Sequence, residues 1–243
     1  MVLIPLLQRC VQLLFLPIFV LSYLGLWGSL CKSIFPYLMS KACRLVNKIM
    51  HKEKQQLFSR LPDFAGPSGK LTVLEIGAGS GANFQFYPPG CRVICTDPNP
   101  NFEQYLLNNV AESQHLQFEG FVVAAAENLR PVPDNSVDVV VSTHVLCSVR
   151  NATVALNEVL RVLRPGGAYF FMDHVAGDRF SWCYFWQQIC DPTWNYLGDG
   201  CSVTRETWKV LENAKFSKLN LRHIMAPVVF IVVRPHILGY AVK

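Results

Sequence analysis

The chain has 243 residues, of which 51% are hydrophobic and 16% are charged, and it carries a net charge of +5. This length suits one α/β domain with an additional segment and is ample for a sizeable core. The positive charge lies in residues 32–60, at +6, which leaves residues 61–243 at −2. That near-neutral balance argues against a nucleic-acid-binding surface on the larger part of the chain.

The N-terminal segment is apolar. Residues 10–31 are 22 residues without a charged side chain, which is long enough to cross a bilayer as a helix. We expect residues 1–31 to be a retained membrane anchor. A cleaved signal peptide is the alternative, but no clear small-x-small cleavage site precedes Lys32. The segment permits either one straight span or a shallow hairpin bent at Pro17.

Residues 32–69 are expected to be a basic juxtamembrane segment and a linker. Basic side chains that flank an apolar segment mark its cytoplasmic side and attract anionic lipid headgroups. Seven of them follow here: Lys32, Lys41, Arg44, Lys48, Lys52, Lys54 and Arg60. Residues 62–69 are rich in proline and glycine and predict a turn-rich linker. The catalytic domain is expected at residues 70–243.

The rest of the chain alternates predicted strands and helices. Strands are predicted at 70–76, 91–96, 117–124, 137–142, 168–173, 216–225 and 228–242. Helices are predicted at 100–113, 152–163, 180–197 and 204–214, with a brief one at 83–87. Strands separated by helices indicate a parallel sheet of the α/β class, and the two terminal strands would make one edge mixed.

The first predicted strand runs into a glycine-rich turn. Gly77, Gly79 and Gly81 alternate with small residues, of which the first is Ala78, and Glu75 lies two positions before the turn. Glycine permits positive φ and a close approach of the backbone to a ligand. The GxGxG spacing differs from that of dinucleotide and triphosphate sites. It predicts a nucleotide-like cofactor at this turn, with a plain tight turn as the alternative.

Acidic residues follow the next two strands. Asp97, before Pro98 and Asn99, ends the second strand, where a carboxylate can accept hydrogen bonds from both ribose hydroxyls. A helix-capping aspartate is the alternative. Glu127 follows the third strand and is expected to face the adenine or to be a solvated loop acid.

The order of these motifs resembles that of class I S-adenosylmethionine (SAM) methyltransferases of the UbiE-like type, over about residues 70–175. More narrowly, the sequence is similar to the membrane-associated methyltransferase-like seven family, which is also described as alkyl thiol methyltransferases. Matching segments include CKSIFPY, GANFQFYPPGCRV, DPNPNFE, DPTW and TRETW. The resemblance implies a Rossmann-like fold with a mostly parallel seven-stranded sheet, a C-terminal antiparallel strand and an N-terminal membrane-anchor helix.

The resemblance also implies a cofactor, an acceptor and a location. SAM would be bound by Glu75, Gly77, Ala78, Gly79, Gly81, Asp97, Pro98, Asn99, Glu127 and Thr143. The acceptor would be a small lipophilic thiol, at the cytosolic face of the endoplasmic reticulum membrane and lipid droplet, and no nucleic acid is expected. The alternatives are a methyltransferase for a quinone, sterol or lipid hydroxyl, and a non-catalytic lipid-droplet protein that retains the fold.

A thiol acceptor reacts as its thiolate, and a free thiol has a pKa of about 8.5. Because an apolar pocket raises that pKa further, a base or a positive charge is useful. Asp173, His174 and His144 end the fifth and fourth predicted strands and are the candidate catalytic residues, with a structural role as the alternative for each. His144 stands where the family leads us to expect an apolar residue, and Asp173 where we expect glutamate.

The chain has nine cysteines, an odd number, and no CxxC pair. This pattern shows neither a zinc-type spacing nor a disulfide framework, so we expect reduced thiols and no metal. Cys201 is expected to be a pocket or core thiol, since direct methyl transfer needs no covalent intermediate. Five aromatic residues lie within residues 182–194. They are expected to form core packing, a membrane-contacting face or a substrate lid.

Overall fold

The computed structural model describes residues 3–66 and 69–243 and contains a seven-stranded sheet in the order β3-β2-β1-β4-β5-β7-β6. The strands are β1 (Thr72–Ile76), β2 (Arg92–Asp97), β3 (Gln117–Val123), β4 (Val137–Thr143), β5 (Leu163–His174), β6 (Lys218–Met225) and β7 (Pro235–Val242). Strands β1 to β5 pair in parallel, and β7 is antiparallel to both β5 and β6. The predicted mostly parallel sheet with an antiparallel C-terminal strand is confirmed.

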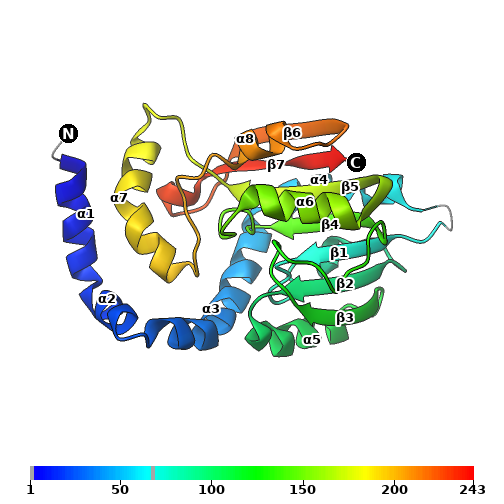
Figure 1. The fold of residues 1–243 in the computed structure, drawn as a ribbon, viewed down its shortest axis with the longest axis horizontal. Helices are drawn as coiled ribbons and strands as arrows, with labels where there is room; N and C mark the ends of the chain where they lie inside the picture. The colour runs from blue at the N-terminus through cyan, green and yellow to red at the C-terminus, as the bar shows by residue number, and fades with distance from the viewer. Residues whose placement is uncertain (1–2, 67–68) are drawn as a thin grey trace.

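Helices cover both faces of the sheet (Figure 1). They are α1 (Leu3–Leu14), α2 (Leu16–Tyr23), α3 (Trp27–Ile49), α4 (His51–Phe58), α5 (Glu103–Glu112), α6 (Ala152–Val162), α7 (Trp182–Leu197) and α8 (Thr207–Asn213). Side chains alternate between the faces of a strand, so β4 contributes Val140 to the core under α6 and α8, and Val139 to the core under α4 and α5.

The strand β5 begins five residues before its predicted start. Residues 164–167, Arg-Pro-Gly-Gly, lie between the helix predicted to end at 163 and the strand predicted to begin at 168, but the chain is already extended from Leu163. The pairing with β4 shifts register between Val137 and Val139, which accommodates the extra residues as a bulge. A Cβ at Gly167 would lie 2.7 Å from the backbone oxygen of Asp138, so only glycine fits there.

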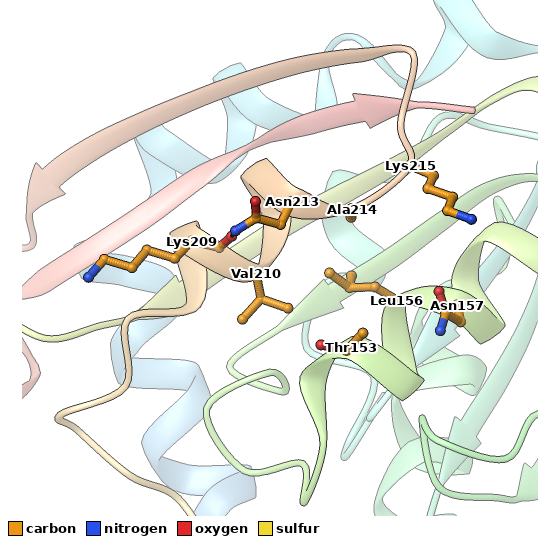
Figure 2. A pocket seen from close by; sticks show the side chains of 8 residues that line it. All are labelled: Thr153, Leu156, Asn157, Lys209, Val210, Asn213, Ala214 and Lys215. Atoms are coloured by element: carbon orange, nitrogen blue, oxygen red, sulfur yellow. The ribbon is translucent and has the colours of Figure 1, made fainter.

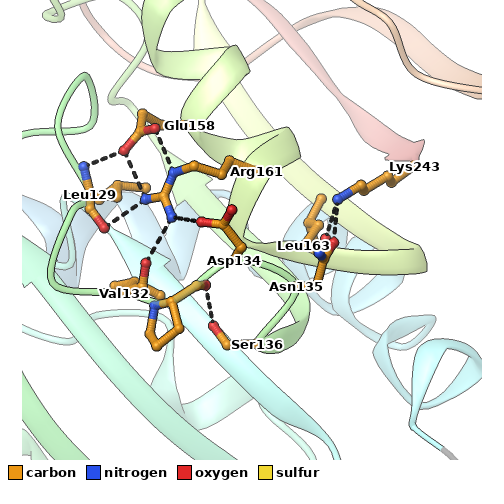
Figure 3. A network of polar contacts seen from close by, with 10 residues as sticks. Leu129, Val132, Asp134, Asn135, Ser136, Glu158, Arg161, Leu163 and Lys243 are labelled. Carbon is orange, nitrogen blue, oxygen red and sulfur yellow. Dashed lines mark hydrogen bonds and ion pairs between the residues drawn. The ribbon is translucent and has the colours of Figure 1, made fainter.

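The C-terminal strand is shorter than predicted and lies inside the sheet. Residues 228–234 form a loop with a short 3-10 turn, so β7 starts at Pro235. Between β5 and β7, His174 pairs with His236. At the other end of β7, the Lys243 ammonium donates hydrogen bonds of 2.6 Å to Asn135 and to the Leu163 carbonyl (Figure 3).

The N-terminal segment does not form the single anchor helix that the resemblance implies. It forms α1 and α2, which bend by 78° and are separated at Phe15, two residues before the alternative bend predicted at Pro17. Pro17 lies in the first turn of α2, where its missing N–H costs nothing. Within residues 3–66 and 69–243, each helix alone is too short or too polar to cross a membrane; the bent pair α1–α2 passes on length and composition together. Residues 1–2 of the predicted anchor lie outside the described part.

The predicted juxtamembrane segment is helical. It forms α3 and α4, followed by a 3-10 turn at Leu61–Phe64; residues 67–68 of the predicted linker lie outside the described residues. Figure 1 shows α1, α2 and α3 running past the carboxyl ends of the parallel strands, with α7 between α1 and the sheet. The N-terminal helices therefore lie at the edge of the sheet where α/β proteins bind ligands.

One arginine links α6 to the loop before β4 (Figure 3). Arg161 forms ion pairs with Glu158, at 2.7 Å, and with Asp134, at 2.5 Å. Its guanidinium also donates to the carbonyl oxygens of Leu129 and Val132, at 2.8 and 3.0 Å. The planar fork of arginine can serve these acceptors simultaneously, which no other side chain can do.

Replacing this arginine tests its contribution to stability. We expect Arg161→Gln to lower the free energy of unfolding by about 2 kcal/mol, because its carboxylate and carbonyl partners lose a charged donor. Arg222, exposed on β6, provides the control, and Arg222→Gln should change stability by less than about 0.5 kcal/mol. Thermal unfolding of the full chain in detergent, followed by circular dichroism, measures both. Equal shifts for the two variants would contradict this account.

Candidate functional site

The glycine turn after β1 has the backbone conformation that its sequence predicts. Gly77, Gly79 and Gly81 have φ of +59°, +52° and +74°, which is the region that favours glycine. A Cβ at Gly77 would lie 2.5 Å from the side chain of Val145, and one at Gly81 would lie 2.6 Å from the ring of Phe84. The turn is therefore closely packed at Gly77 and Gly81, and its central residue, Gly79, is less closely packed.

Asp97 is buried at the end of β2 and faces this turn. Its Oδ2 accepts a hydrogen bond from the N–H of Gly79 at 3.1 Å, and its Oδ1 accepts one from the N–H of Asn99 at 2.9 Å. Burial raises the pKa of Asp97 to about 6, although these two N–H groups oppose the rise. Helix capping belongs to the neighbouring Asn99, whose side chain accepts from the N–H of Asn101. Pro98, between them, is exposed.

These residues fit the adenosyl part of SAM. Each carboxylate oxygen of Asp97 accepts one backbone N–H in the hydrogen bonds described above, so lone pairs are left for hydroxyl donors. The backbone N–H of Ala78 bonds to the Thr96 carbonyl at 3.0 Å, which fixes the turn beside β2. A glycine backbone next to a buried carboxylate is the arrangement that a ribose and its base require.

Glu75 organises the turn from below. Its Oε1 accepts from the side-chain amide of Asn83 at 2.7 Å, and its Oε2 accepts from the Tyr87 hydroxyl at 2.8 Å. Asn83 also donates to Thr143, at the end of β4, at 3.0 Å. Burial raises the pKa of Glu75 to about 7, although both hydrogen bonds to its carboxylate lower it.

Lys54 joins this network from the N-terminal helices, which corrects its predicted role at lipid headgroups. Its side chain is 3% exposed. The ammonium donates to Asn47 at 2.7 Å and to Asn83 at 2.8 Å, and burial lowers its pKa to about 8. A sequence signal was available, because Lys54 shares a helical face with the buried residues Met50 and Phe58.

Helix α3 covers the outer side of the turn. The carbonyl oxygen of Lys32 accepts hydrogen bonds from the side chains of Asn99, at 2.9 Å, and Asn101, at 3.1 Å. At the other end of α3, Asn47 donates to the carbonyl of Ala82 at 2.6 Å. Residues that the sequence assigned to a membrane-flanking segment thus form one wall of the site.

Glu127 lies in the loop after β3. Its Oε1 accepts from the backbone N–H groups of Arg150 and Asn151, at 2.6 and 3.3 Å. It therefore connects this loop to the start of α6. Its contact with the adenine stays a prediction.

The three predicted catalytic residues lie together at the ends of β4 and β5. The rings of His144 and His174 stack with their centres 5.8 Å apart, and His144 Nε2 lies 3.1 Å from Nε2 of His236. His144 adopts φ of +59°, which is unusual for a residue other than glycine. Burial and the neighbouring imidazoles hold the pKa of His144 well below its usual value.

Asp173 and His174 carry polar atoms that the described residues leave without partners. Oδ1 of Asp173 accepts from the N–H of Cys147 at 3.4 Å, whereas its buried Oδ2 has no hydrogen-bond partner among the described residues. Burial raises the pKa of Asp173 to about 7. His174 Nε2 lies 3.2 Å from the Cys201 sulfur, and Nδ1 has no partner within residues 3–66 and 69–243.

One cluster of cysteine and histidine side chains at this site was not predicted from the sequence. Cys147, His174 and Cys201 each offer one ligand atom, these atoms all lie within 4.8 Å of one another, and all three residues are buried. Cys201, expected to be a pocket or core thiol, is buried. The indole N–H of Trp194 donates to the Cys201 sulfur at 3.3 Å. The cluster was invisible in the sequence because its members come from the loop after β4, the end of β5 and the loop after α7.

The aromatic residues of α7 do not form a single core. Trp182 is 74% exposed and Trp186 is 41% exposed, so core packing does not account for them. Helix α7 packs on the N-terminal helices instead. Gln8 donates to the carbonyl of Gln188 at 2.8 Å, and the ring of Phe19 lies 4.9 Å from that of Tyr196.

A surface groove of about 420 Å³ lies elsewhere, between α6 and α8 (Figure 2). Leu156 and Val210 face one another inside it, and Lys209 and Lys215 lie at its two ends. None of its lining residues belongs to the glycine turn, the Asp97 region or the histidine cluster. We therefore assign the site to the carboxyl edge of the sheet and not to this groove.

Known proteins match the chain over nearly its full length. The family model described as "Methyltransferase domain" matches residues 74–171. Thiol S-methyltransferase TMT1A from Homo sapiens is 60% identical over 223 residues, which cover 92% of this chain and 91% of the relative. Thiol S-methyltransferase TMT1B from Homo sapiens is 53% identical over 242 residues, covering 100% and 99%.

A solved structure shares the fold. The SAM-dependent methyltransferase from Thermotoga maritima has a TM-score of 0.60 and 18% identity, and the match covers 86% of this chain and 98% of that one. Together with the methyltransferase domain and the fit of the glycine turn and Asp97, these relatives identify SAM as the cofactor. The resemblance seen in the sequence motifs is confirmed. The chain belongs to the thiol S-methyltransferase family, within the class I SAM-dependent methyltransferases.

Proposed function

We propose that this chain transfers the methyl group of SAM to the sulfur of small lipophilic alkyl thiols. One observation carries the proposal, namely that two human thiol S-methyltransferases are 60% and 53% identical over 92% and 100% of the chain. The matches therefore include the acceptor side of the site, residues 143–201, as well as the cofactor turn. A methyltransferase that acts on a quinone or sterol hydroxyl would need to share the cofactor turn but not the acceptor side.

SAM supplies a methyl group on a positively charged sulfonium, so the acceptor sulfur must approach in line with that bond. In our proposal Asp97 accepts the ribose hydroxyls, and the backbone from Gly77 to Gly81 lies against the nucleoside. Glu75 acts by positioning, because both its oxygens are occupied by neighbouring side chains. Glu127 has a second carboxylate oxygen that would reach the adenine amino group.

The acceptor lies, in this proposal, beside Thr143 and the groups that end β4 and β5. His144, Asp173 and His174 surround the acceptor sulfur and assist its ionisation. Burial keeps His144 neutral, and a neutral imidazole nitrogen can accept a hydrogen bond or a proton. Burial of these side chains lowers the local dielectric, which strengthens their polar interactions.

We also infer that the N-terminal helices attach the protein to a membrane. Every residue of α1 and α2 is at least partly exposed, and Leu13, Leu14 and Tyr23 are 66%, 79% and 91% exposed. Trp182 on the adjoining α7 is also exposed. Six of the seven basic residues from 32 to 60 are exposed and available to anionic headgroups. The endoplasmic reticulum and lipid droplet, with the catalytic part cytosolic, are the proposed location.

A transfer assay tests the proposed reaction. Full-length protein in membranes, with isotopically labelled SAM, is expected to methylate alkyl thiols and not phenols or sterol hydroxyls. Asp97→Asn should weaken binding of S-adenosylhomocysteine by about 2 kcal/mol, roughly thirty-fold, because its amide lacks the charge that strengthens the ribose hydrogen bonds. Transfer to phenols alone would overturn the acceptor, and undetectable nucleoside binding by calorimetry would indicate a non-catalytic protein.

The pH dependence of cofactor binding tests the role of Asp97. Only the carboxylate can accept from both hydroxyls, so affinity should be lost as the pH falls through about 6, the pKa of Asp97. Below that pH the loss should approach about tenfold per pH unit. Calorimetric titration of S-adenosylhomocysteine between pH 5 and 8 measures it. The affinity of Asp97→Asn should not change with pH. Glu75→Gln removes any contribution from the ionisation of Glu75 near pH 7. A wild-type affinity that does not change with pH would contradict the assignment.

Flotation with vesicles tests membrane attachment. Replacing both Leu13 and Leu14 by Gln should reduce binding to phosphatidylcholine–phosphatidylserine vesicles at least tenfold, because each buried leucine contributes about 1.5–3 kcal/mol. Leu107→Gln is the matched control, since this leucine is 46% exposed on α5. High salt should weaken wild-type binding through the basic residues. Equal flotation of all three proteins would exclude α1 and α2 as the attachment surface.

A further inference from the structure

The cluster of Cys147, His174 and Cys201 has the composition of a metal site. Its three ligand atoms lie within 4.8 Å of one another, and the His174 nitrogen lies 3.2 Å from the Cys201 sulfur. In a tetrahedral zinc site, bonds of about 2.3 Å to sulfur and about 2.0 Å to nitrogen put neighbouring ligand atoms roughly 3.5–3.8 Å apart. Small side-chain movements would suffice to close this cluster on one ion.

The burial of these side chains also points to a ligand. Cys147, His174 and Cys201 are 1%, 8% and 6% exposed. Oδ2 of Asp173 and Nδ1 of His174, on two neighbouring residues, are buried and have no partner among the described residues. Because buried polar atoms are almost always satisfied in native proteins, these two atoms need partners from outside the polypeptide, although a metal at His174 Nε2 would not itself bond either of them.

The chemistry of the ligands selects the metal. Two thiolates and one imidazole suit zinc, whereas magnesium and calcium prefer a full set of oxygen ligands. The indole N–H of Trp194 donates to the Cys201 sulfur at 3.3 Å, which stabilises a thiolate there. The site therefore offers three side chains that can bind zinc and one hydrogen bond that supports a ligand sulfur.

The number of ligands separates a structural site from a reactive one. Structural zinc sites usually have four protein ligands, and catalytic sites have three plus an open position. Within residues 3–66 and 69–243, the cluster contains three. It also lies beside the cofactor turn, since Cys147 follows two residues after Val145, whose side chain packs against Gly77.

We propose that Cys147, His174 and Cys201 bind one zinc ion and that its fourth position receives the acceptor thiol. The second half of this inference rests on the proposed thiol transfer, whereas zinc binding itself does not. The role of His174 near the acceptor is then that of a metal ligand, and His144 stacks against it as a positioning residue.

The step balances without a redox partner. On binding zinc, the acceptor loses its S–H bond, the sulfur keeps the electron pair, and the proton passes to water. The thiolate sulfur then forms a bond to the methyl carbon, and the carbon–sulfonium bond breaks with its electron pair going to the departing thioether. At pH 7 a thiol with a pKa of about 8.5 is about 3% ionised, so zinc can raise the thiolate fraction roughly thirty-fold.

Metal analysis of the full-length protein tests the site. Protein that is purified in detergent, under anaerobic conditions and without a chelator, should contain one zinc per chain, as measured by inductively coupled plasma mass spectrometry. Cys147→Ser, Cys201→Ser and His174→Ala should lose it. Cys91→Ala removes a buried cysteine outside the cluster and should retain it. Binding of S-adenosylhomocysteine shows which variants are folded, and Cys201→His, which keeps a zinc ligand, should retain metal if Cys201→Ser unfolds.

Cobalt substitution tests the open position. The Co(II) protein should show the visible bands of a four-coordinate ion and a thiolate charge-transfer band that changes when an alkyl thiol is added. Removing the metal with a chelator should lower thiol transfer roughly thirty-fold at pH 7, with S-adenosylhomocysteine binding retained, and zinc should restore it.

Four outcomes overturn parts of this inference. Wild-type protein with no more zinc than Cys201→Ser overturns the metal site, as does a Cys147–Cys201 disulfide in protein purified without oxygen. A cobalt spectrum unchanged by thiols overturns the open position. Full transfer activity without metal overturns zinc activation and leaves the proposed function intact. Zinc-loaded protein that binds S-adenosylhomocysteine but methylates no thiol instead overturns the proposed function.

Discussion

A buried lysine links the N-terminal helices to the cofactor turn. Lys54 contacts Asn47 on α3 and Asn83 beside the turn, and Asn83 passes the contact on to Glu75. Burying two opposite charges costs solvation energy, so such a network is maintained only when every polar atom finds a partner. Burial lowers the pKa of Lys54 and raises the pKa of Glu75, so desolvation disfavours the charged form of both groups.

The candidate site includes segments from both ends of the chain. The cofactor wall includes the Lys32 carbonyl of α3, and the acceptor side includes His236 of β7. The two ends of the chain therefore meet the carboxyl edge of one sheet. In the proposed function, the N-terminal helical segment would connect the surface where a lipophilic acceptor partitions to the site where the acceptor reacts.

Local patterns predicted the parts of the molecule that depend on local order. The glycine turn after β1 and Asp97 at the end of β2 were predicted correctly, because the spacing of glycines along the sequence reflects the positive φ that the turn requires. The early start of β5 at Leu163 was missed because a Pro-Gly-Gly run indicates a turn, and only pairing with β4 makes it extended. The burial of Lys54 and the approach of Cys147 to Cys201 were missed because residues distant in the sequence create them.

The position of β7 has a consequence for how the chain folds during synthesis. This strand lies between β5 and β6 and pairs with both. Strand β6 consequently has no neighbour in the sheet until residues 235–242 have been made, and His236 reaches the site only then. The apolar N-terminal helices leave the ribosome first. With the membrane attachment that we propose, these helices would reach the lipid surface before the sheet can close, and the nascent chain would bind there as an incomplete enzyme.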